Sequence, residues 1–434
     1  MKIGFYLDNS KHMNVDYSDP HKGNPGIGGT QYMFWTISYY LMELFSEFEV
    51  ILFAQYTERL PSNIESVKVN DILDAINKSK IMCVDIFVFG GPEKDKKVFD
   101  CIDKLKLKSI MWSHCYEDYK SLNNAAKCEY LIKNICVGKE QYDRLRDHDI
   151  FIKSKYIFNA LDLSIYENYA QKNNEKQNIV CYMGAITPYK GFHVIAKCWK
   201  EIVKKVPSAK LYVIGSGKLY NKKSSMGNFG IAEESYEKKF IKYLLDKNGK
   251  ILDSVKFFGV LGGNEKLKII SEAKVGIANP IGTSETFCLV ATEFQAVGVP
   301  VVSKNKYGLL DTVRNGQTGY LINNNTEFID RIVELLIDND TNKRYSEESK
   351  WFIKHNFDIY EICNEWKNTI LNIFNNDNRN IVNLKSNNYY NDLKWLRELN
   401  RNIRIKFKFI PSILCYKFIF DKFKEKIKSI FKYC

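Results

Sequence analysis

The sequence predicts an α/β protein with two Rossmann-like domains, each built around a parallel sheet. Short apolar runs alternate with helical patterns through both halves of the chain, and this alternation is typical of βαβ units. The length of 434 residues exceeds what one hydrophobic core usually serves, so two domains are expected. Hydrophobic residues form 45% and charged residues 26% of the chain, which is normal for a globular protein.

The first half contains five apolar runs that we predict as strands. They are Lys2–Leu7, Glu49–Ala54, Ile86–Gly90, Ser109–Ser113 and Asn134–Val137. Helical patterns fall between them, for example at Thr30–Phe45 and Glu140–Arg146. Strands that alternate with helices form parallel sheets, so residues 1–165 are predicted to form the first domain.

The second half repeats this pattern after a polar stretch near Ala160–Gln177. Its predicted strands are Ile179–Met183, Lys210–Ile214, Val255–Phe258, Lys274–Ala278 and Pro300–Ser303. Its predicted helices are Gly191–Lys204, Glu234–Asp246 and a helical region from Asn323 to near Asn375. We therefore expect a second domain at residues 178–375. An Asn-rich break then begins a linker and tail at residues 376–434.

The segment Asn279–Glu293 combines a strand end, a Pro/Gly turn and a predicted helix that runs to Gly298. A Ser or Thr is expected at its N-cap, and free N–H groups at such a terminus favour phosphate. Glu285 and Glu293 are eight residues apart, so on one helix they would lie near one face, about 12 Å apart. That separation is too long for the paired carboxylates of a retaining hydrolase. A carboxylate beside a phosphate site suits another role, such as accepting hydrogen bonds from sugar hydroxyls.

Several loops follow predicted strands, where open α/β sheets bind their ligands. Asn24–Thr30 is rich in glycine, which allows close approach of a ligand. His114 follows the strand Ser109–Ser113, and a structural and a functional role are equally open for it. Lys190 stands at a helix N-terminus, where a cation opposes the helix dipole. A bound phosphate would remove that conflict.

Other motifs indicate structure rather than chemistry. The eleven cysteines contain no CxxC pair, so we expect reduced thiols and no metal site. The D-x-D segments Asp147–Asp149 and Asp338–Asp340 are expected on the solvated surface, and Asn159–Asp162 as an Asx-type turn. The N-terminus looks like a strand rather than a signal peptide. We therefore expect a cytoplasmic protein, with peripheral attachment to the inner face of a membrane as an open alternative.

As a set, these motifs resemble the retaining glycosyltransferases of family 4, which have the GT-B fold. The resemblance covers about residues 1–370. The matching elements are Gly28-Gly29-Thr30, His114, the block from Gly184 to Lys190-Gly191, Gly215-Ser216-Gly217, Phe258-Gly259, Glu285 and Glu293 as E-x7-E, Gly298–Val302 and Gly316–Leu321. The resemblance implies a nucleotide-diphosphate sugar as donor, a saccharide or lipid-linked acceptor bound on the side of the first domain, and no cofactor or metal.

The resemblance also implies residue roles. Lys190 would pair with the diphosphate, while Glu285 and His114 would contact the transferred sugar. The donor would be held further by Gly28, Gly29, Val260, Thr286, Phe287, Cys288 and Glu293. Of these, Glu293 would bind the ribose hydroxyls and the Val260 backbone would meet the base. The family usually has Arg after the glycine that corresponds to Gly184, whereas this chain has Ala185, so one diphosphate cation is missing.

The C-terminal tail holds most of the excess positive charge. Residues 393–434 contain twelve Lys/Arg and three Asp/Glu, a net charge of +9, whereas the other 392 residues contain 52 and 48, a net charge of +4. Apolar residues recur at helical spacing within Ile413–Lys432, with lysines between them. This pattern fits a helix on an anionic membrane surface or a helix packed on the protein's own body. Both interpretations remain open.

Two other functions were weighed against sugar transfer. A GT-B sugar-nucleotide epimerase would share the fold but is not expected to carry the E-x7-E block. A nucleic-acid-binding protein would use the basic tail, but the tail contains no recognisable nucleic-acid module and the body is nearly neutral. We therefore expect a hexosyltransferase-type enzyme with no nucleic-acid partner.

Overall fold

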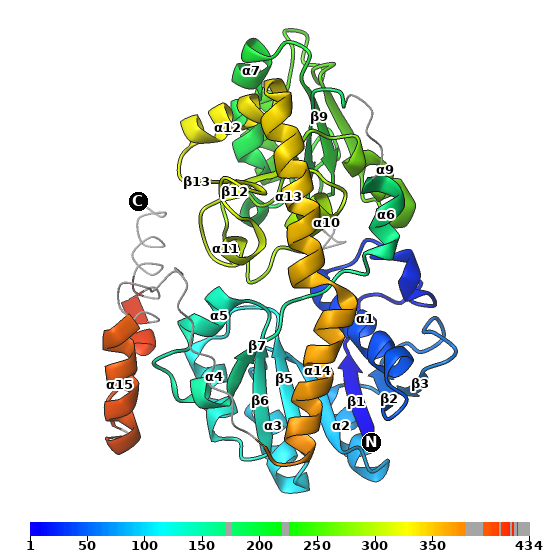
Figure 1. The fold of residues 1–434 in the computed structure, drawn as a ribbon, viewed down its shortest axis with the longest axis vertical. Coiled ribbons are helices and arrows are strands. Elements are labelled where there is room, and N and C mark those ends of the chain that lie inside the picture. Colours follow the sequence, from blue (N-terminus) through cyan, green and yellow to red (C-terminus); the bar gives the residue numbers. More distant parts are fainter. Residues whose placement is uncertain are drawn as a thin grey trace.

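The computed structural model describes residues 1–170, 176–218, 225–377, 394–407, 409–416, 419–420 and 423. Two α/β domains stand one above the other, each with a parallel sheet flanked by helices (Figure 1). The predicted fold class is therefore confirmed. The loops at the carboxyl ends of both sets of strands face the boundary between the domains, which is where parallel α/β sheets bind ligands.

The first sheet has seven strands in the order β3-β2-β1-β4-β5-β6-β7. The strands are β1 (Lys2–Leu7), β2 (Glu49–Ala54), β3 (Glu65–Lys68), β4 (Ile86–Gly91), β5 (Ser109–Ser113), β6 (Leu131–Cys136) and β7 (Ser154–Tyr156). The helices are α1 (Gly29–Leu44), α2 (Ile72–Ile81), α3 (Lys96–Leu105), α4 (Tyr119–Lys127) and α5 (Lys139–Arg144), with the 3-10 helix η2 (Asp149–Lys153). All five predicted strands are present, although β6 begins three residues earlier than expected.

The second sheet has six strands in the order β10-β9-β8-β11-β12-β13. The strands are β8 (Ile179–Met183), β9 (Lys210–Ile214), β10 (Val255–Gly259), β11 (Val275–Ile277), β12 (Val301–Lys304) and β13 (Gly319–Ile322). The helices are α7 (Phe192–Lys205), α8 (Glu234–Phe240), α9 (Gly263–Ser271), α10 (Leu289–Ala296), α11 (Leu309–Thr312), α12 (Asn325–Ile337) and α13 (Asn339–Phe357). The predicted helix Glu234–Asp246 was too long. It breaks after Phe240 into a 3-10 turn, and Leu245 then pairs with Ile251 in a short antiparallel bridge.

The connection between the domains contains α6 (Ser164–Ala170), and part of the predicted linker, 171–175, lies outside the described residues. The chain returns to the first domain through α14 (Ile359–Phe374). Its Trp366 ring lies 6.4 Å from Phe5 and 4.7 Å from Trp112, measured between ring centroids. The hydrophobic core of the first sheet is therefore completed by a helix that follows the second domain in sequence. The Asn-rich break after residue 377 also lies outside the described residues.

Candidate active site

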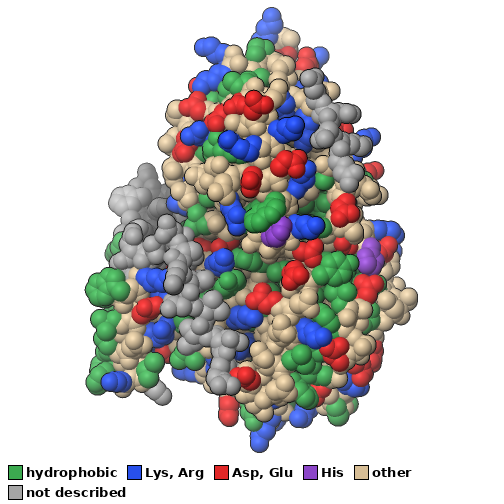
Figure 2. Space-filling model, viewed as in Figure 1, with side chains coloured by type: hydrophobic (Ala, Val, Ile, Leu, Met, Phe, Trp, Pro, Cys, Tyr) green, Lys and Arg blue, Asp and Glu red, His purple; other side chains and the backbone are tan. Residues whose placement is uncertain are grey.

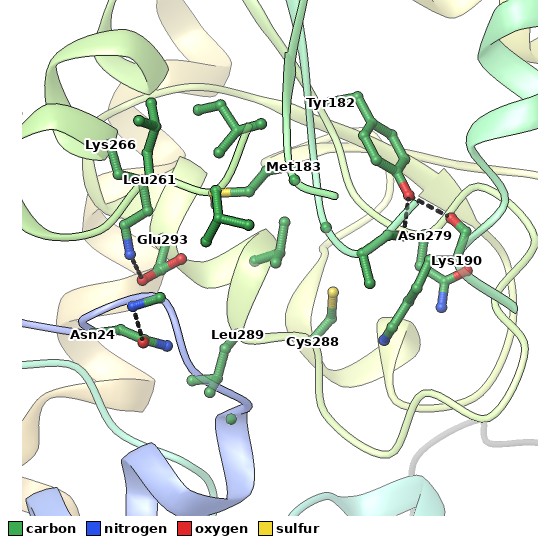
Figure 3. A pocket seen from close by; sticks show the side chains of 18 of the residues that line it. Asn24, Tyr182, Met183, Lys190, Leu261, Lys266, Asn279, Cys288, Leu289 and Glu293 are labelled. Carbon is green, nitrogen blue, oxygen red and sulfur yellow. Dashed lines mark hydrogen bonds and ion pairs between the residues drawn. The ribbon is translucent and has the colours of Figure 1, made fainter. Parts of the chain in front are cut away.

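A pocket lies between the glycine-rich loop of the first domain and the strand ends of the second (Figure 3). Its lining residues are Asn24, Gly26, Ile27, Gly29, Tyr182, Met183, Gly184, Ala185, Lys190, Ile214, Gly215, Val260, Leu261, Lys266, Asn279, Glu285, Phe287, Cys288, Leu289, Val290 and Glu293. Seven of the ten predicted site residues, including Gly29, are among them. Gly28, Thr286 and His114 lie outside this lining.

The glycine-rich loop is shaped by Asn24 and by contacts across the domain boundary. The Asn24 Oδ1 atom accepts hydrogen bonds from the N–H groups of Gly26 and Ile27, both at 2.9 Å. Gly28 is the N-cap of α1, and a Cβ atom on Gly29 would lie 2.9 Å from Leu289 Cδ1. The absence of a side chain at Gly29 thus lets α1 approach the first turn of α10.

Two glycines make the strand ends of the second domain compact. A Cβ atom on Gly215 would lie 1.9 Å from the carbonyl oxygen of Gly184, so no other residue fits there without moving the backbone. Gly215 also has a φ of +141°, which L side chains rarely adopt. The loops that follow β8 and β9 therefore contact each other through the backbone atoms of Gly184 and Gly215, which both line the pocket.

Glu285 does not lie on a helix, contrary to the sequence prediction. The helix α10 begins only at Leu289, and its N-cap is Cys288 rather than a Ser or Thr. The preceding chain is turned by Ser284, at φ +53°. The Glu285 carbonyl accepts from the Gly308 N–H at 2.8 Å instead of joining a helical ladder. The estimate of helical spacing between Glu285 and Glu293 was therefore wrong, because only Glu293 belongs to α10.

Lys190 and Glu285 form an ion pair in the pocket. The Lys190 Nζ lies 2.7 Å from Glu285 Oε2, and the Asn279 amide donates to the same oxygen at 2.6 Å. Lys190 ends a 3-10 turn directly before Gly191, the N-cap of α7. The carboxylate supplies the negative charge that the sequence led us to expect from a phosphate. A cation, a carboxylate and an amide therefore converge at this end of the pocket.

A second ion pair involves a lysine that the sequence did not reveal. Lys266, on α9, lies 2.5 Å from Glu293 Oε1, and both side chains are only 7% exposed. The Tyr166 hydroxyl donates to the same oxygen at 3.2 Å. In the close-up, this pair and Lys190 lie on opposite sides of the pocket, with Met183 and Cys288 between them. No feature of the sequence singles out Lys266, because lysines are common on helices that are expected to face solvent.

The remaining predicted donor contacts come from the chain before α10 and from the loop after β10. Phe287 and Cys288 line the pocket, while Val260 lines it from the opposite loop and is 47% exposed. The Thr286 hydroxyl instead donates to the carbonyl oxygen of His114. Thr286 therefore links the two domains, and its side chain does not line the pocket.

His114 is buried in the first domain rather than open to the pocket. Its ring packs 4.5 Å from Trp112 and 5.7 Å from Phe34, measured between ring centroids. Burial lowers the pKa of His114 to about 3, because a charged imidazolium loses its hydration there. Its Nε2 is buried without a hydrogen-bond partner among the described residues. The imidazole is therefore neutral near pH 7.

Ala185 lies in the pocket wall where the resemblance led us to expect an arginine. It is 1% exposed and its methyl group offers no charge. Lys266 is the other lysine that lines this pocket besides Lys190. The positive charge at the site therefore comes from lysines on separate elements.

The prediction of solvated surface was wrong for the first two residues of the D-x-D segment Asp147–Asp149, whereas Asp149 is exposed. Asp147 and His148 are fully buried, because Arg397 from the C-terminal helix forms an ion pair with Asp147 at 2.6 Å. Asp338 is exposed and caps α13. The Asx-type turn predicted at Asn159–Asp162 is not formed by Asn159, whose Oδ1 has no hydrogen-bond partner among the described residues; an Asx turn begins instead at Asp162, where Oδ1 accepts from the Ser164 N–H at 3.0 Å. Within the described ranges, no three His, Cys, Asp or Glu side chains are grouped as metal ligands.

Residues 167–351 match the family described as Glycosyl transferases group 1. The chain is 28% identical over 173 residues to D-inositol 3-phosphate glycosyltransferase of Corynebacterium efficiens, covering 39% of this chain and 37% of that protein. It is 26% identical over 264 residues to the uncharacterized glycosyltransferase MJ1178 of Methanocaldococcus jannaschii, covering 58% of this chain and 65% of that protein. The matched regions thus span 37% to 65% of these relatives' own lengths.

Solved structures share the two-domain architecture. HepE of Anabaena in complex with UDP-glucose superposes with a TM-score of 0.60 at 14% identity, covering 86% of this chain and 99% of that chain. The matched family region contains both ion pairs and the start of α10. Residues 167–351 are thus similar to the glycosyl transferases group 1 family, within a chain that has the GT-B fold.

Proposed function

We propose that this protein is a retaining glycosyltransferase that moves a sugar from a nucleotide-diphosphate sugar to a saccharide or lipid-linked acceptor. The observation that carries the proposal is the Lys190–Glu285 pair, which lines the interdomain pocket beside the first turn of α10. A cation and the N-terminal end of a helix suit a diphosphate. The neighbouring carboxylate suits sugar hydroxyls.

The departing diphosphate gains negative charge as its bond to the anomeric carbon breaks. Lys190 and the first turn of α10 stabilise that charge, and such stabilisation is often the largest single contribution to catalysis. The acceptor oxygen attacks the same face of the sugar, and its proton passes to the leaving phosphate oxygen. The configuration at the anomeric carbon is thereby retained without a protein nucleophile.

The ligand-free pair suggests how the donor enters. Lys190 and Glu285 have side-chain exposures of 27% and 11%, so a diphosphate reaches the ammonium group from the pocket. When the diphosphate pairs with Lys190, Glu285 is released from the ion pair and can accept a hydrogen bond from a sugar hydroxyl. Asn279 already donates to that carboxylate at 2.6 Å and holds it in place.

The Lys266–Glu293 pair sits at the other end of the pocket and serves the nucleoside. Lys266 and Tyr166 both contact Oε1 of Glu293. The hydrogen bonds and the ion pair of Glu293 within the described residues all involve Oε1, and Oε2 is the oxygen that we assign to the ribose hydroxyls. Lys266 therefore orients Glu293, rather than taking the place of the arginine expected at Ala185.

A panel of nucleotide sugars tests the function. HepE was solved with UDP-glucose, so UDP-sugars are the first choice, followed by GDP- and ADP-sugars. We expect one base class to raise the melting temperature and to release nucleoside diphosphate when acceptor is supplied. No stabilisation by any donor would contradict the proposal. Conversion of the donor to an epimerised sugar nucleotide would instead support an epimerase.

A further inference from the structure

The C-terminal helix α15 (Lys394–Lys406) packs on the first domain through charged side chains and exposes its apolar ones. An ordinary amphipathic helix buries its apolar side chains and exposes its charges. In α15, Arg397 and Arg404 are the buried residues. Trp395 is 68% exposed and Ile405 is 58% exposed. The helix is therefore held by charge while its apolar side faces outward.

Buried arginines form the attachment. Arg397 donates to Asp147 Oδ1 through Nε at 2.7 Å and to the Arg144 carbonyl at 2.6 Å. Arg404 donates to the Asp147 carbonyl at 3.0 Å and lies 3.1 Å from Asp149. The Leu414 N–H donates to Asp147 Oδ2 at 2.6 Å. Both the helix and the segment after it are thus fixed around one buried aspartate.

The outward side of this element is strongly apolar and aromatic. Figure 2 shows hydrophobic side chains along the lower left edge of the molecule, where Figure 1 places α15. The exposed apolar residues of this C-terminal surface are Trp395, Leu396, Leu399, Ile403, Ile405, Phe407, Phe409, Tyr416, Ile419, Phe420 and Phe423. A patch of this size, spread over α15 and the described residues after it, marks an interaction surface.

The charge of the segment identifies the partner. Lys406 is exposed beside the apolar residues, and residues 393–434 have a net charge of +9. Arg397, Arg401 and Arg404 all donate to the first domain, whereas the exposed Lys406 faces solvent and can meet an external anion. Aromatic and apolar side chains flanked by lysines suit the interface of an anionic bilayer. A second copy would bring two like-charged surfaces together.

We propose that the C-terminal surface formed by α15 and the described residues 407, 409–416, 419–420 and 423 docks the protein on an anionic lipid bilayer. The buried Arg–Asp contacts orient the surface, so that the first domain is held beside the membrane. The proposal concerns α15 and the residues described after it; most of the helix predicted within Ile413–Lys432 lies outside the described residues. The inference does not depend on the sugar-transfer proposal.

Vesicle co-sedimentation of the full-length protein tests the proposal. We compare phosphatidylcholine vesicles with vesicles that also contain phosphatidylglycerol. Binding is expected to be at least about tenfold stronger to the anionic vesicles and to weaken as salt is raised. Equal binding to both vesicles, or none, would overturn the proposal.

The double variant Trp395→Ser/Phe409→Ser removes two exposed aromatics, which are 68% and 83% exposed. We expect at least about a tenfold loss of anionic-vesicle binding with an unchanged melting temperature. The matched control Trp351→Ser/Ile81→Ser changes residues that are 50% and 79% exposed elsewhere, and it should bind vesicles like the wild type. If the Trp395/Phe409 variant binds vesicles normally but loses a concentration-dependent dimer, the surface serves a second copy and the proposal fails.

Discussion

The two walls of the pocket differ in charge. The wall from the second domain holds both lysine–glutamate pairs, Lys190–Glu285 and Lys266–Glu293. The wall from the first domain presents Asn24, Gly26, Ile27 and Gly29, and the nearby His114 is buried and neutral at pH 7. Under the proposed function, this difference assigns recognition of the charged donor to the second domain. The first domain contributes shape and close backbone approach.

The largest effect is expected from Lys190→Ala, which removes the accessible cation of the charged wall. Loss of one preorganised charge at a leaving group typically costs about 10²–10³ in rate. We therefore expect kcat to fall by that factor, measured as initial rates of nucleotide release. Lys190→Arg, which keeps the charge, serves as the control. A Lys190→Ala enzyme within a few-fold of the wild-type rate would contradict the assigned role.

Glu285→Gln is expected to lower kcat by about ten- to a hundredfold, because a neutral amide accepts hydrogen bonds from sugar hydroxyls less strongly than a carboxylate. The amide still fits beside Asn279, so the melting temperature should change little. Rates at saturating donor separate this effect from binding. A variant that retains nearly the full rate would remove Glu285 from the mechanism.

Lys266→Met should act on donor binding and on stability rather than on the chemical step. Removing one partner of a buried ion pair typically costs about 3–5 kcal/mol, and a misplaced Glu293 should raise the donor KM about tenfold. The double variant Lys266→Met/Glu293→Gln should recover most of the stability but not the KM. Urea unfolding and donor titrations measure both quantities. Recovery of KM in the double variant would show that Glu293 does not bind the ribose.

Gly29→Val tests the shape contribution of the uncharged wall. Its side chain would press on Leu289, since a Cβ atom there would already lie 2.9 Å from Leu289 Cδ1. We expect the donor KM to rise by several-fold, roughly 1 kcal/mol, with a smaller change in kcat. Adding Leu289→Ala makes room and should restore part of the loss. If Leu289→Ala does not help, the contact between the walls is not what limits binding.

A substitution of His114 is expected to have the smallest effect on the reaction. Its effect should appear instead in the pH dependence of the free energy of unfolding. Its pKa is about 3 in the folded protein and about 6.5 when unfolded, so only the unfolded state takes up a proton between these values. Its stabilising contribution is full above pH 6.5 and is lost as the pH falls toward 3. At pH 5 the loss is about 2 kcal/mol.

Urea unfolding at pH 7 and pH 5 measures this loss by comparing the wild type with His114→Gln. The variant, which does not titrate, should lose less stability on acidification. Equal losses in the two proteins would show that His114 is not held neutral by burial.

The sequence revealed those parts of the fold that carry local signals. Long buried runs such as Lys2–Leu7 and Ile179–Met183 form strands at the predicted residues. The strands β3 and β7 were missed because they are short, polar edge segments, Glu-Ser-Val-Lys and Ser-Lys-Tyr. β13 was also missed, because it is only four residues long and follows a glycine turn.

The candidate site was only partly predictable, because its remaining features depend on tertiary contacts. The turn at Ser284 and the bond from Gly308 to the Glu285 carbonyl take Glu285 off the helix, and no local pattern specifies them. Lys266 pairs with Glu293 across 27 residues. The burial of Asp147 depends on Arg397, 250 residues later.

Calorimetric titration of a nucleoside diphosphate tests the central claim most directly, because it needs neither the sugar nor the acceptor to be known. The nucleotide released in the donor screen is titrated into wild-type and Lys190→Ala protein. We predict one site per chain in the wild type and at least about tenfold weaker binding in the variant. Equal affinity in the two proteins would contradict the claim that Lys190 holds the diphosphate at the charged wall.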